Sequence, residues 1–204
     1  MNKIDVKEPV SNDGKDIIEL SIPYRVEITL KGTSDLLFHK WSCEGIEAKS
    51  KAAKGSVAKK TDDIESYVYR CEDNTIGIPG EYLRGAIINA AKFRQDPRSP
   101  RKSAQDLYKA GIASITDVAS LGKTTWDKLH QGRVVIQRSA ITRIRPCFLK
   151  GWEATFILLV LLPEYIPLEN LTQVINDAGR LIGVGDFRPT YGRFCITQIS
   201  VLSD

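Results

Sequence analysis

Residues 168–201 read LENLTQVINDAGRLIGVGDFRPTYGRFCITQISV, and this stretch decides the fold class. Its apolar residues return every three or four positions, which is the period of a helix with one buried face. Gly183 and Gly185 end that helix, and residues 193–201 have the pattern of a strand. A helix that leads through a glycine-containing loop into a final strand is therefore predicted. The apolar positions of the helix are Leu168, Leu171, Val174, Ile175, Ala178, Leu181 and Ile182.

Similar patterns earlier in the chain supply the other elements. Residues 24–31, YRVEITLK, alternate apolar and polar side chains, as a strand with one buried face does. A second amphipathic helix begins at Pro79-Gly80 and stops before Asp96-Pro97. Residues 152–162 are apolar on both parities and predict a central strand that is covered on both faces. Further strands are expected at residues 64–70, 75–78, 133–137 and 140–147.

This order predicts an α+β fold with ferredoxin-like, RRM-like βαββαβ topology. The antiparallel sheet has its helices on one face, and its other face is free to bind. We expect a loose segment at residues 1–20 and a single domain at residues 21–204. A flexible basic insertion is expected at about 43–63 and an irregular insertion at about 96–131, where the patterns favour no particular structure.

The composition excludes several classes of protein. The net charge is +4, a mild excess. The four cysteines are scattered without a CxxC pair and there are only two histidines, so we expect no metal site and no cofactor. Scattered cysteines without a signal peptide favour a reduced, cytoplasmic protein. The apolar run at residues 154–163 is too short to cross a bilayer, so no membrane partner is expected.

Positive charge concentrates between Lys128 and Trp152, where the sequence has no acidic residue. On a strand, Arg143 and Arg145 share a face about 7 Å apart, which matches neighbouring phosphates of a single strand. Arginine also grips phosphate through two parallel hydrogen bonds. We therefore count Arg138, Arg143 and Arg145 as candidate RNA-binding residues. The alternative is a solvated face of scattered arginines.

The segment from Gly183 to Phe194, GVGDFRPTYGRF, is a second candidate site. Its glycines permit positive φ and close approach of another backbone, while its rings offer faces on which bases stack. The loop follows the C-terminus of a helix and has no GK[ST], which disfavours a nucleotide-binding P-loop, a Rossmann fold or a kinase. The alternative is a helix-ending glycine turn before an edge strand. The candidate RNA-binding residues are Gly183, Gly185, Phe187, Arg188, Tyr191, Gly192 and Arg193.

Two further candidates lie in the first half of the chain. IPGEYLRGA, residues 78–86, opens a helix whose free N–H groups are able to hold a phosphate with the help of Arg84. The alternative is ordinary helix initiation, which Glu81 also fits. The basic insertion is a candidate arm that grips nucleic acid or, alternatively, a solvated loop. Its candidate residues are Lys49, Lys51, Lys54, Lys59 and Lys60.

These pieces, in this order, resemble the RAMP superfamily of CRISPR-associated RNA-binding proteins. The resemblance rests on YRVEITLKGTSDLLFHK near the start, IPGEYLRGAI before the first helix and LIGVGDFRPTYGRFCI near the end. It is strongest to the backbone subunit that polymerises along guide RNA. It implies that Gly80 and Arg84, together with the glycine loop, lie near the RNA backbone. The loop departs from the family pattern at Asp186 and Pro189, which make it less basic and stiffer.

The leading hypothesis is a non-catalytic RNA-binding subunit that assembles in several copies along guide or other single-stranded RNA in a CRISPR-type antiviral ribonucleoprotein. Its expected partners are that RNA, target nucleic acid, copies of itself and other effector subunits. One alternative is a metal-independent ribonuclease, for which His39, Asp35 and His130 are weak catalytic candidates. Another alternative is a structural or assembly protein of a mobile element.

Overall fold

The computed structural model describes residues 22–40, 63–136 and 139–202, and its main sheet has four strands. Their order across the sheet is β12–β1–β11–β7, and each neighbouring pair is antiparallel. The strands are β1 (Tyr24–Gly32), β7 (Ile112–Ser114), β11 (Glu153–Val160) and β12 (Phe194–Leu202).

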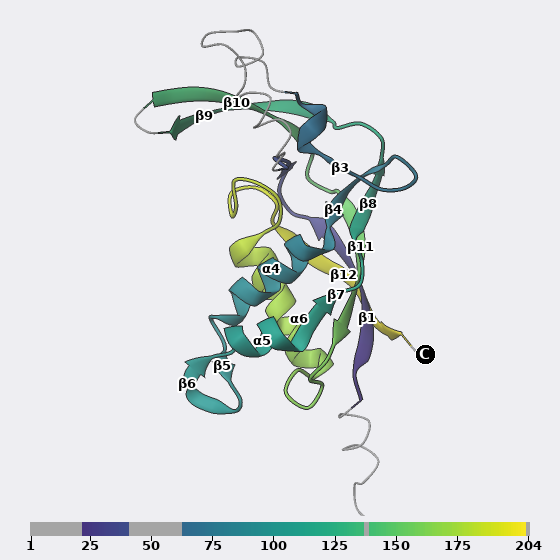
Figure 1. Cartoon of the computed structure of the whole chain (residues 1–204), viewed down its shortest axis with the longest axis vertical. Helices are drawn as coiled ribbons and strands as arrows, with labels where there is room; N and C mark the ends of the chain where they lie inside the picture. Colours follow the sequence, from purple (N-terminus) through teal and green to yellow (C-terminus); the bar gives the residue numbers. More distant parts are fainter. Residues whose placement is uncertain (1–21, 41–62, 137–138, 203–204) are drawn as a thin grey trace, which may run out of the picture.

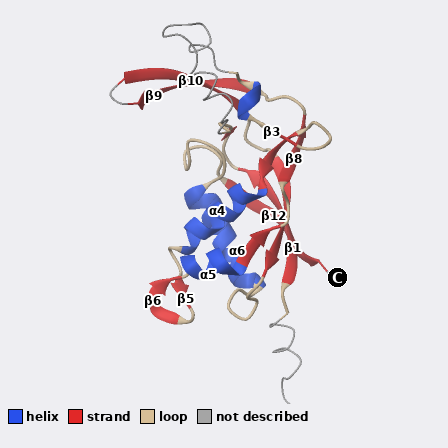
Figure 2. Ribbon diagram, in the orientation of Figure 1, coloured by secondary structure: helices blue, strands red, loops and turns tan. Residues whose placement is uncertain are grey.

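Three helices cover one face of this sheet (Figures 1 and 2). They are α4 (Gly80–Ala91), α5 (Gln105–Gly111) and α6 (Leu168–Asp177). The last helix continues through a π-helical turn, Ala178–Ile182, and ends at Gly183 with a φ of 75°. Glycine is the residue that adopts this conformation without strain. The predicted α+β class with antiparallel sheets is confirmed.

The hydrophobic core lies between the sheet and these helices. Val26, Ile28 and Leu30 of β1 are fully buried, whereas the residues between them are not, as the alternation predicted. Residues 153–160 form an inner strand of the sheet, as predicted, but the predicted cover on both faces was wrong. Burial alternates along β11, and Ile157 and Leu159 are only partly covered because no second layer of helices packs on that face.

The face of the main sheet opposite the helices is open but balanced in charge. On β1 and β11 it presents Arg25 and Lys31 together with Glu27 and Glu153. Lys31 Nζ and Glu153 Oε1 form an ion pair of 2.9 Å, and the Thr29 and Thr155 hydroxyls hydrogen-bond at 3.0 Å. The charges of this face therefore do not support the expectation that it binds nucleic acid. A surface with equal numbers of positive and negative charges attracts a polyanion only weakly.

Two small sheets and a hairpin complete the described chain. Their strands are β2 (Leu36–Leu37), β3 (Tyr69–Arg70), β4 (Ile76–Pro79), β5 (Gln95–Asp96), β6 (Ser99–Ser103), β8 (Val118–Lys123), β9 (Lys128–Ile136) and β10 (Ser139–Phe148). The sheets have the orders β2–β10–β9 and β3–β4–β8. The hairpin of β9 and β10 projects from one end of the molecule, and the β5–β6 hairpin lies at the other end (Figure 1).

Two expectations about local structure need correction, the strand at residues 64–70 and the irregular insertion at about 96–131. Residues 64–70 contain a 3₁₀ turn, Glu65–Tyr67, before the short β3. The region 96–131 is regular and consists of the β5–β6 hairpin, α5, β7, β8 and the start of β9. The expected loose segment at residues 1–20 and nearly all of the expected insertion at 43–63 lie outside the described residues. No helix in the described part of the chain is long and apolar enough to cross a membrane.

Gly192 carries a prediction about stability. Its φ is 74°, and a Cβ atom at this position would lie 1.7 Å from the carbonyl oxygen of Val184. We expect Gly192→Ala to lower the free energy of unfolding by about 3 kcal/mol or more, because left-handed strain and a backbone clash add together. Gly122→Ala is the control: its φ is 69° but no atom lies within 4 Å, so about 1 kcal/mol is expected. Equal losses in urea titrations of both variants would contradict this.

Candidate nucleic-acid interface

The glycine loop, residues 183–192, folds back on itself and rests on the segment between β1 and β2. The N–H of Val184 donates to the carbonyl of Gly192 at 2.9 Å. The N–H of Gly192 donates to the carbonyl of Asp35 at 2.7 Å, and that of Asp186 to the carbonyl of Leu37 at 2.9 Å. A Cβ at Gly185 would lie 2.6 Å from the oxygen of Leu37. The backbone that approaches these glycines closely is therefore that of the protein itself and not that of a bound strand.

Arg145 of β10 connects the β9–β10 hairpin to this loop. Its Nε donates to Asp186 Oδ2, and its guanidinium carbon lies 4.3 Å from the centre of the Phe187 ring. The side chain is 7% exposed, and its Nη1 has no hydrogen-bond partner. Arg145 therefore holds two segments of the protein together and does not reach out to phosphate. Phe187, whose side chain lies against Arg145, is still 37% exposed.

A second contact between the hairpin and the loop involves rings. His130 lies opposite Arg145 in the β9–β10 register. Its ring is 5.1 Å from the ring of Tyr191, at an angle of 57°. Arg143 pairs with Gly132 on the same face and is partly buried. The predicted shared face of Arg143 and Arg145 is thus present, and it is turned toward the glycine loop.

Asp35, which lies between β1 and β2, contacts the base of the β9–β10 hairpin. Its carboxylate accepts hydrogen bonds from Lys128 Nζ at 2.9 Å and from the N–H of Lys150 at 2.9 Å. The hydrogen bond from Lys128 is the main cause that holds the pKa of Asp35 below its usual value. Burial raises the pKa of the nearby Cys147 thiol to about 11, so the thiol stays protonated and faces Asp35. These bonds make Asp35 a structural anchor rather than a free catalytic acid.

The N-terminus of α4 is not available to phosphate in the way the sequence suggested. The N–H of Gly80 donates to the carbonyl of Asp117 at 2.8 Å, and a Cβ at Gly80 would lie 2.0 Å from the carbonyl oxygen of Thr116. Arg84 turns away toward the end of α5. It donates to the carbonyls of Ile112 at 2.9 Å and Lys109 at 2.8 Å. Both residues therefore fix the packing of α4.

A groove runs between α4 and the glycine loop. Two adjoining hollows of about 290 and 440 Å³ share four lining residues. His39 and Tyr82 line the first hollow, and Lys92 and Phe187 line the second. The shared residues are Asn89, Gly185, Asp186 and Arg188.

The groove combines flat rings, neutral polar groups and cations with two carboxylates, Glu81 and Asp186, which are paired with Arg84 and Arg145. The Tyr82 hydroxyl lies 3.0 Å from that of Tyr69. Burial is the main cause that raises the pKa of Tyr82, which keeps this hydroxyl protonated. Arg188 is exposed and borders both hollows. Such a surface fits a chain that carries bases and phosphates.

The structure brings some of the predicted residues together and separates others. Gly185, Phe187 and Arg188 border the groove, and His39 does so too. Arg193 is exposed beside the loop, where its N–H donates to Ser34 Oγ. Gly183 and Gly192 shape the loop from within. The basic insertion residues Lys49, Lys51, Lys54, Lys59 and Lys60, together with Arg138, lie outside the described residues.

Sequence reasoning missed Tyr82, Asn89 and Lys92 as groove residues. A signal was present, because Asn89 and Lys92 are three residues apart and lie off the apolar face of α4. What the sequence did not reveal is that the glycine loop packs beside this helix.

Among known proteins, the chain has a weak likeness to two solved structures. No protein-family model and no curated protein sequence matches the chain. A chain of the type III-B Cmr-beta complex bound to cognate target RNA matches at a TM-score of 0.49 and 9% identity, over 93% of this chain. Cmr6 from Pyrococcus furiosus matches at a TM-score of 0.45 and 11% identity, over 86% of this chain and 99% of its own length.

This chain spans only 64% of the length of the Cmr-beta chain. The chemistry of the surface is therefore argued from this chain's own residues.

The Arg145 contact predicts a loss of stability on a substitution that keeps the charge. Arg145→Lys removes the flat guanidinium that bonds Asp186 and covers Phe187, so we expect the free energy of unfolding to fall by about 1–3 kcal/mol. Arg133→Lys, on the exposed part of β9, is expected to change it by less than about 0.5 kcal/mol. Denaturant titration measures both variants. An unaffected Arg145→Lys protein would show that the contact does not hold the hairpin.

The lowered pKa of Asp35 predicts a dependence of stability on pH. A carboxylate whose pKa is lower in the folded state stabilises the fold above its unfolded pKa, about 3.9. That stabilisation is lost as the pH falls through the folded pKa. Asp35→Asn should therefore flatten the acid limb of a plot of unfolding free energy against pH. Asp117 is exposed and makes no side-chain ion pair with the described residues, so Asp117→Asn is the control and should leave the limb steep.

Proposed function

We propose that this chain is an RNA-binding subunit that holds a single strand in the groove between α4 and the glycine loop. The observation that carries the proposal is the composition of this groove. Exposed Arg188 and Lys92 border it, together with the half-exposed ring of Phe187 and the polar groups of Tyr82 and Asn89. Cations attract the phosphates, and rings stack on bases without reading their identity.

The β9–β10 hairpin supports the proposal from the side of the groove. It carries a stretch without acidic residues, and its root is fastened to the glycine loop through Arg145. Arg133 is exposed on the hairpin. Arg143 lies on the face of the hairpin that is turned toward the glycine loop. A strand in the groove would therefore lie beside a positive arm. We keep the basic insertion, Lys49 to Lys60, and Arg138 as further candidate contacts.

The arrangement of the main sheet supports a finer assignment of the fold. Counting only its four strands, the sheet order is fourth, first, third, second. Helix α4 lies between the first and second of these strands, and α6 lies between the third and fourth. We propose that this is a ferredoxin-like βαββαβ core into which the other elements are inserted.

The motif resemblance to RAMP proteins supports a place in a CRISPR-type effector ribonucleoprotein. In that proposal the bound strand is guide RNA, the partners are other effector subunits and further copies of the chain, and the role is non-catalytic. Assembly along the strand is expected to need RNA, whereas a structural protein of a mobile element would assemble without it.

A second candidate is metal-independent RNA cleavage, favoured by one observation. His39 lines the same hollow as Arg188 and Tyr82, which places an acid–base group beside a cation suited to a developing negative charge. His130 packs instead on Tyr191. The binding experiment below separates the two candidates, since cleavage would shorten the labelled strand.

Binding to single-stranded RNA should weaken steeply as salt rises. Each phosphate contact contributes about 0.7 to the slope of log affinity against log salt on a single strand, so Lys92→Ser/Arg188→Ser should lower the slope by about 1.4. Arg25→Thr/Lys31→Thr removes the same charge from the open sheet face and is expected to leave the slope unchanged. Fluorescence anisotropy with labelled RNA measures all three proteins. The proposal is wrong if wild-type binding is weak at low salt or indifferent to it.

A further inference from the structure

A second pocket lies at the other end of the molecule, between the β5–β6 hairpin, α5 and α6. Its volume is about 200 Å³. Leu107, Ala104 and Val174 form an apolar part of its lining. The polar side chains that border it are Arg94, Gln95, Tyr108, Tyr165, Asn170 and Gln173. The β5–β6 hairpin lies far from the glycine loop, with α4 between them (Figure 1).

Tyr108 gives this pocket an unused hydrogen-bonding group. The residue is 3% exposed, and its hydroxyl has no hydrogen-bond partner among the described residues. Burial raises the pKa of Tyr108 to about 12, so at neutral pH the hydroxyl both donates and accepts. The ring is buried, and the residue lines the pocket, so this hydroxyl is open to a ligand there. The hydroxyl of Tyr24, by contrast, is used within the protein and donates to the carbonyl of Ile166 at 2.9 Å.

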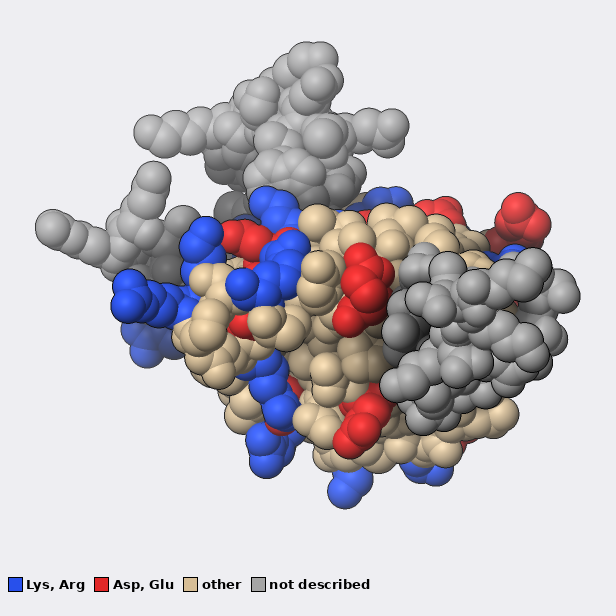
Figure 3. Space-filling model, turned by 90° about the horizontal axis from the view of Figure 1, so that it is seen from below, with Lys and Arg blue, Asp and Glu red and all other residues tan. Residues whose placement is uncertain are grey.

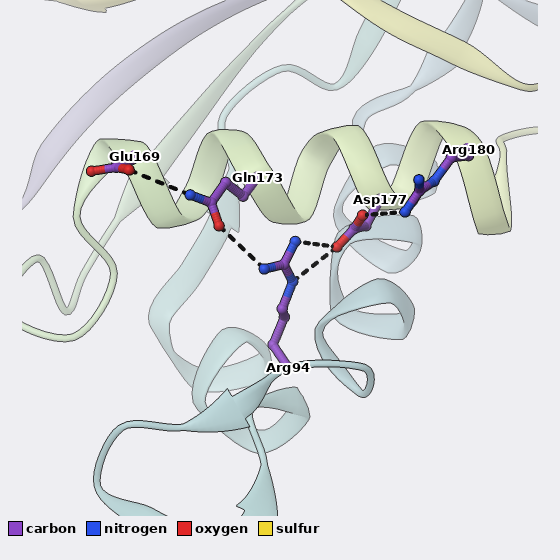
Figure 4. A network of polar contacts seen from close by, with 5 residues as sticks. All are labelled: Arg94, Glu169, Gln173, Asp177 and Arg180. Carbon is purple, nitrogen blue, oxygen red and sulfur yellow. Dashed lines mark hydrogen bonds and ion pairs between the residues drawn. The ribbon is translucent and has the colours of Figure 1, made fainter.

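The wall formed by α6 carries a network of ion pairs and hydrogen bonds. Arg94 donates to Asp177 Oδ2 from Nε at 2.9 Å and from Nη2 at 2.5 Å (Figure 4). Its Nη1 donates to Gln173 at 3.2 Å, and Gln173 donates to Glu169 at 3.4 Å. Because Arg94 is held by Asp177, whose other oxygen accepts from Arg180 at 3.0 Å, the pocket offers amide and hydroxyl groups rather than an unpaired cation.

Asn170 adds a free amide to that wall. Its side chain is exposed and makes no hydrogen bond to the described residues. An amide presents one acceptor and two donors in a plane. Together with Tyr108, it offers complementary partners to a ligand whose edge carries both donors and acceptors.

The rim of the pocket is aromatic and basic. The guanidinium of Arg98 lies 5.6 Å from the centre of the Tyr165 ring and pairs with Asp96 at 2.8 Å. Arg101 and Lys102 do not line the pocket but belong to β6, which leads into the lining residue Ala104. Both are exposed, and neither forms an ion pair within the described part of the chain. Seen from below, Lys and Arg side chains are more frequent toward the left, the side on which both the β5–β6 and the β9–β10 hairpins lie in Figure 1 (Figure 3). The rim therefore suits a flat group attached to a negative backbone.

We propose that this pocket receives a nucleobase of the bound RNA, with the adjoining phosphates on Arg101 and Lys102. The inference rests on the proposed function and extends the strand beyond the groove. Unstacked bases in single-stranded RNA are recognised through their hydrogen-bonding edges and by stacking on rings or guanidinium planes. Amide side chains form two hydrogen bonds with such an edge. A lone phosphate fits poorly, because Asp177 already neutralises Arg94.

The distance between the two sites is compatible with one strand. Helix α4 has 12 residues and is about 18 Å long at 1.5 Å per residue. A strand that leaves the groove past Lys92, near the end of α4, reaches the β5–β6 hairpin within a few nucleotides. The groove is then the part of the path without base preference, and the pocket is the part that discriminates.

Tyr108→Phe and Asn170→Ala test the proposal, because each removes a hydrogen-bonding group and no charge. Affinities are measured for homopolymers of A, U and C of equal length. We expect the preferred homopolymer to bind about three- to tenfold more weakly to each variant, the size of one hydrogen bond, with the salt slope unchanged. Tyr24→Phe is the matched control, since it removes a hydroxyl that bonds Ile166, and it should leave RNA affinity unchanged.

Thermal unfolding without RNA provides an independent readout. Tyr108→Phe should keep or raise the melting temperature, whereas Tyr24→Phe should lower it. If wild type binds RNA with the expected salt dependence but both pocket variants keep every affinity, the pocket holds only water, and the inference fails while the proposed function stands. If wild type binds no RNA, both fail together.

Discussion

The buried guanidinium of Arg145 is the contact on which the arrangement of the candidate interface depends. It joins the root of the β9–β10 hairpin to Asp186 and Phe187 of the glycine loop. A guanidinium is suited to this position because it bonds a carboxylate with its edge and covers a ring with its face. The rings of His130 and Tyr191 make a further contact between hairpin and loop.

The same contact explains the departure of the loop from a purely basic, flexible sequence. Asp186 lowers the positive charge of the loop, but it supplies the carboxylate that Arg145 requires. The glycines allow the loop to close on itself and to rest on Asp35 and Leu37. The loop is less basic, but these contacts hold it in one position. It thereby forms a wall of the groove beside α4, and this wall carries Arg188 and Phe187.

The sequence predicted those parts of the fold that follow from periodicity within one segment. The strand at residues 24–31 and the helices that became α4 and α6 are examples. It failed where partners distant in the sequence decide the outcome. Residues 95–103 form a hairpin although they carry two prolines. The sequence predicted Arg84 and Arg145 as phosphate ligands because the groups that hold them are distant in the chain. Arg84 donates to the carbonyls of Lys109 and Ile112, and Arg145 donates to the carboxylate of Asp186.

The distribution of charge favours the helix side of the molecule over the open sheet face as the path of a polyanion. On the sheet face, Lys31 is already paired with Glu153, and the described side chains of β1 and β11 carry equal numbers of both signs. On the helix side, Arg188 and Lys92 border the groove at one end, where the acids Glu81 and Asp186 are already paired with Arg84 and Arg145. Arg101 and Lys102 lie exposed at the other end. Because unpaired cations release counterions when phosphate binds and paired ones largely do not, the strand gains more along α4 than across the sheet.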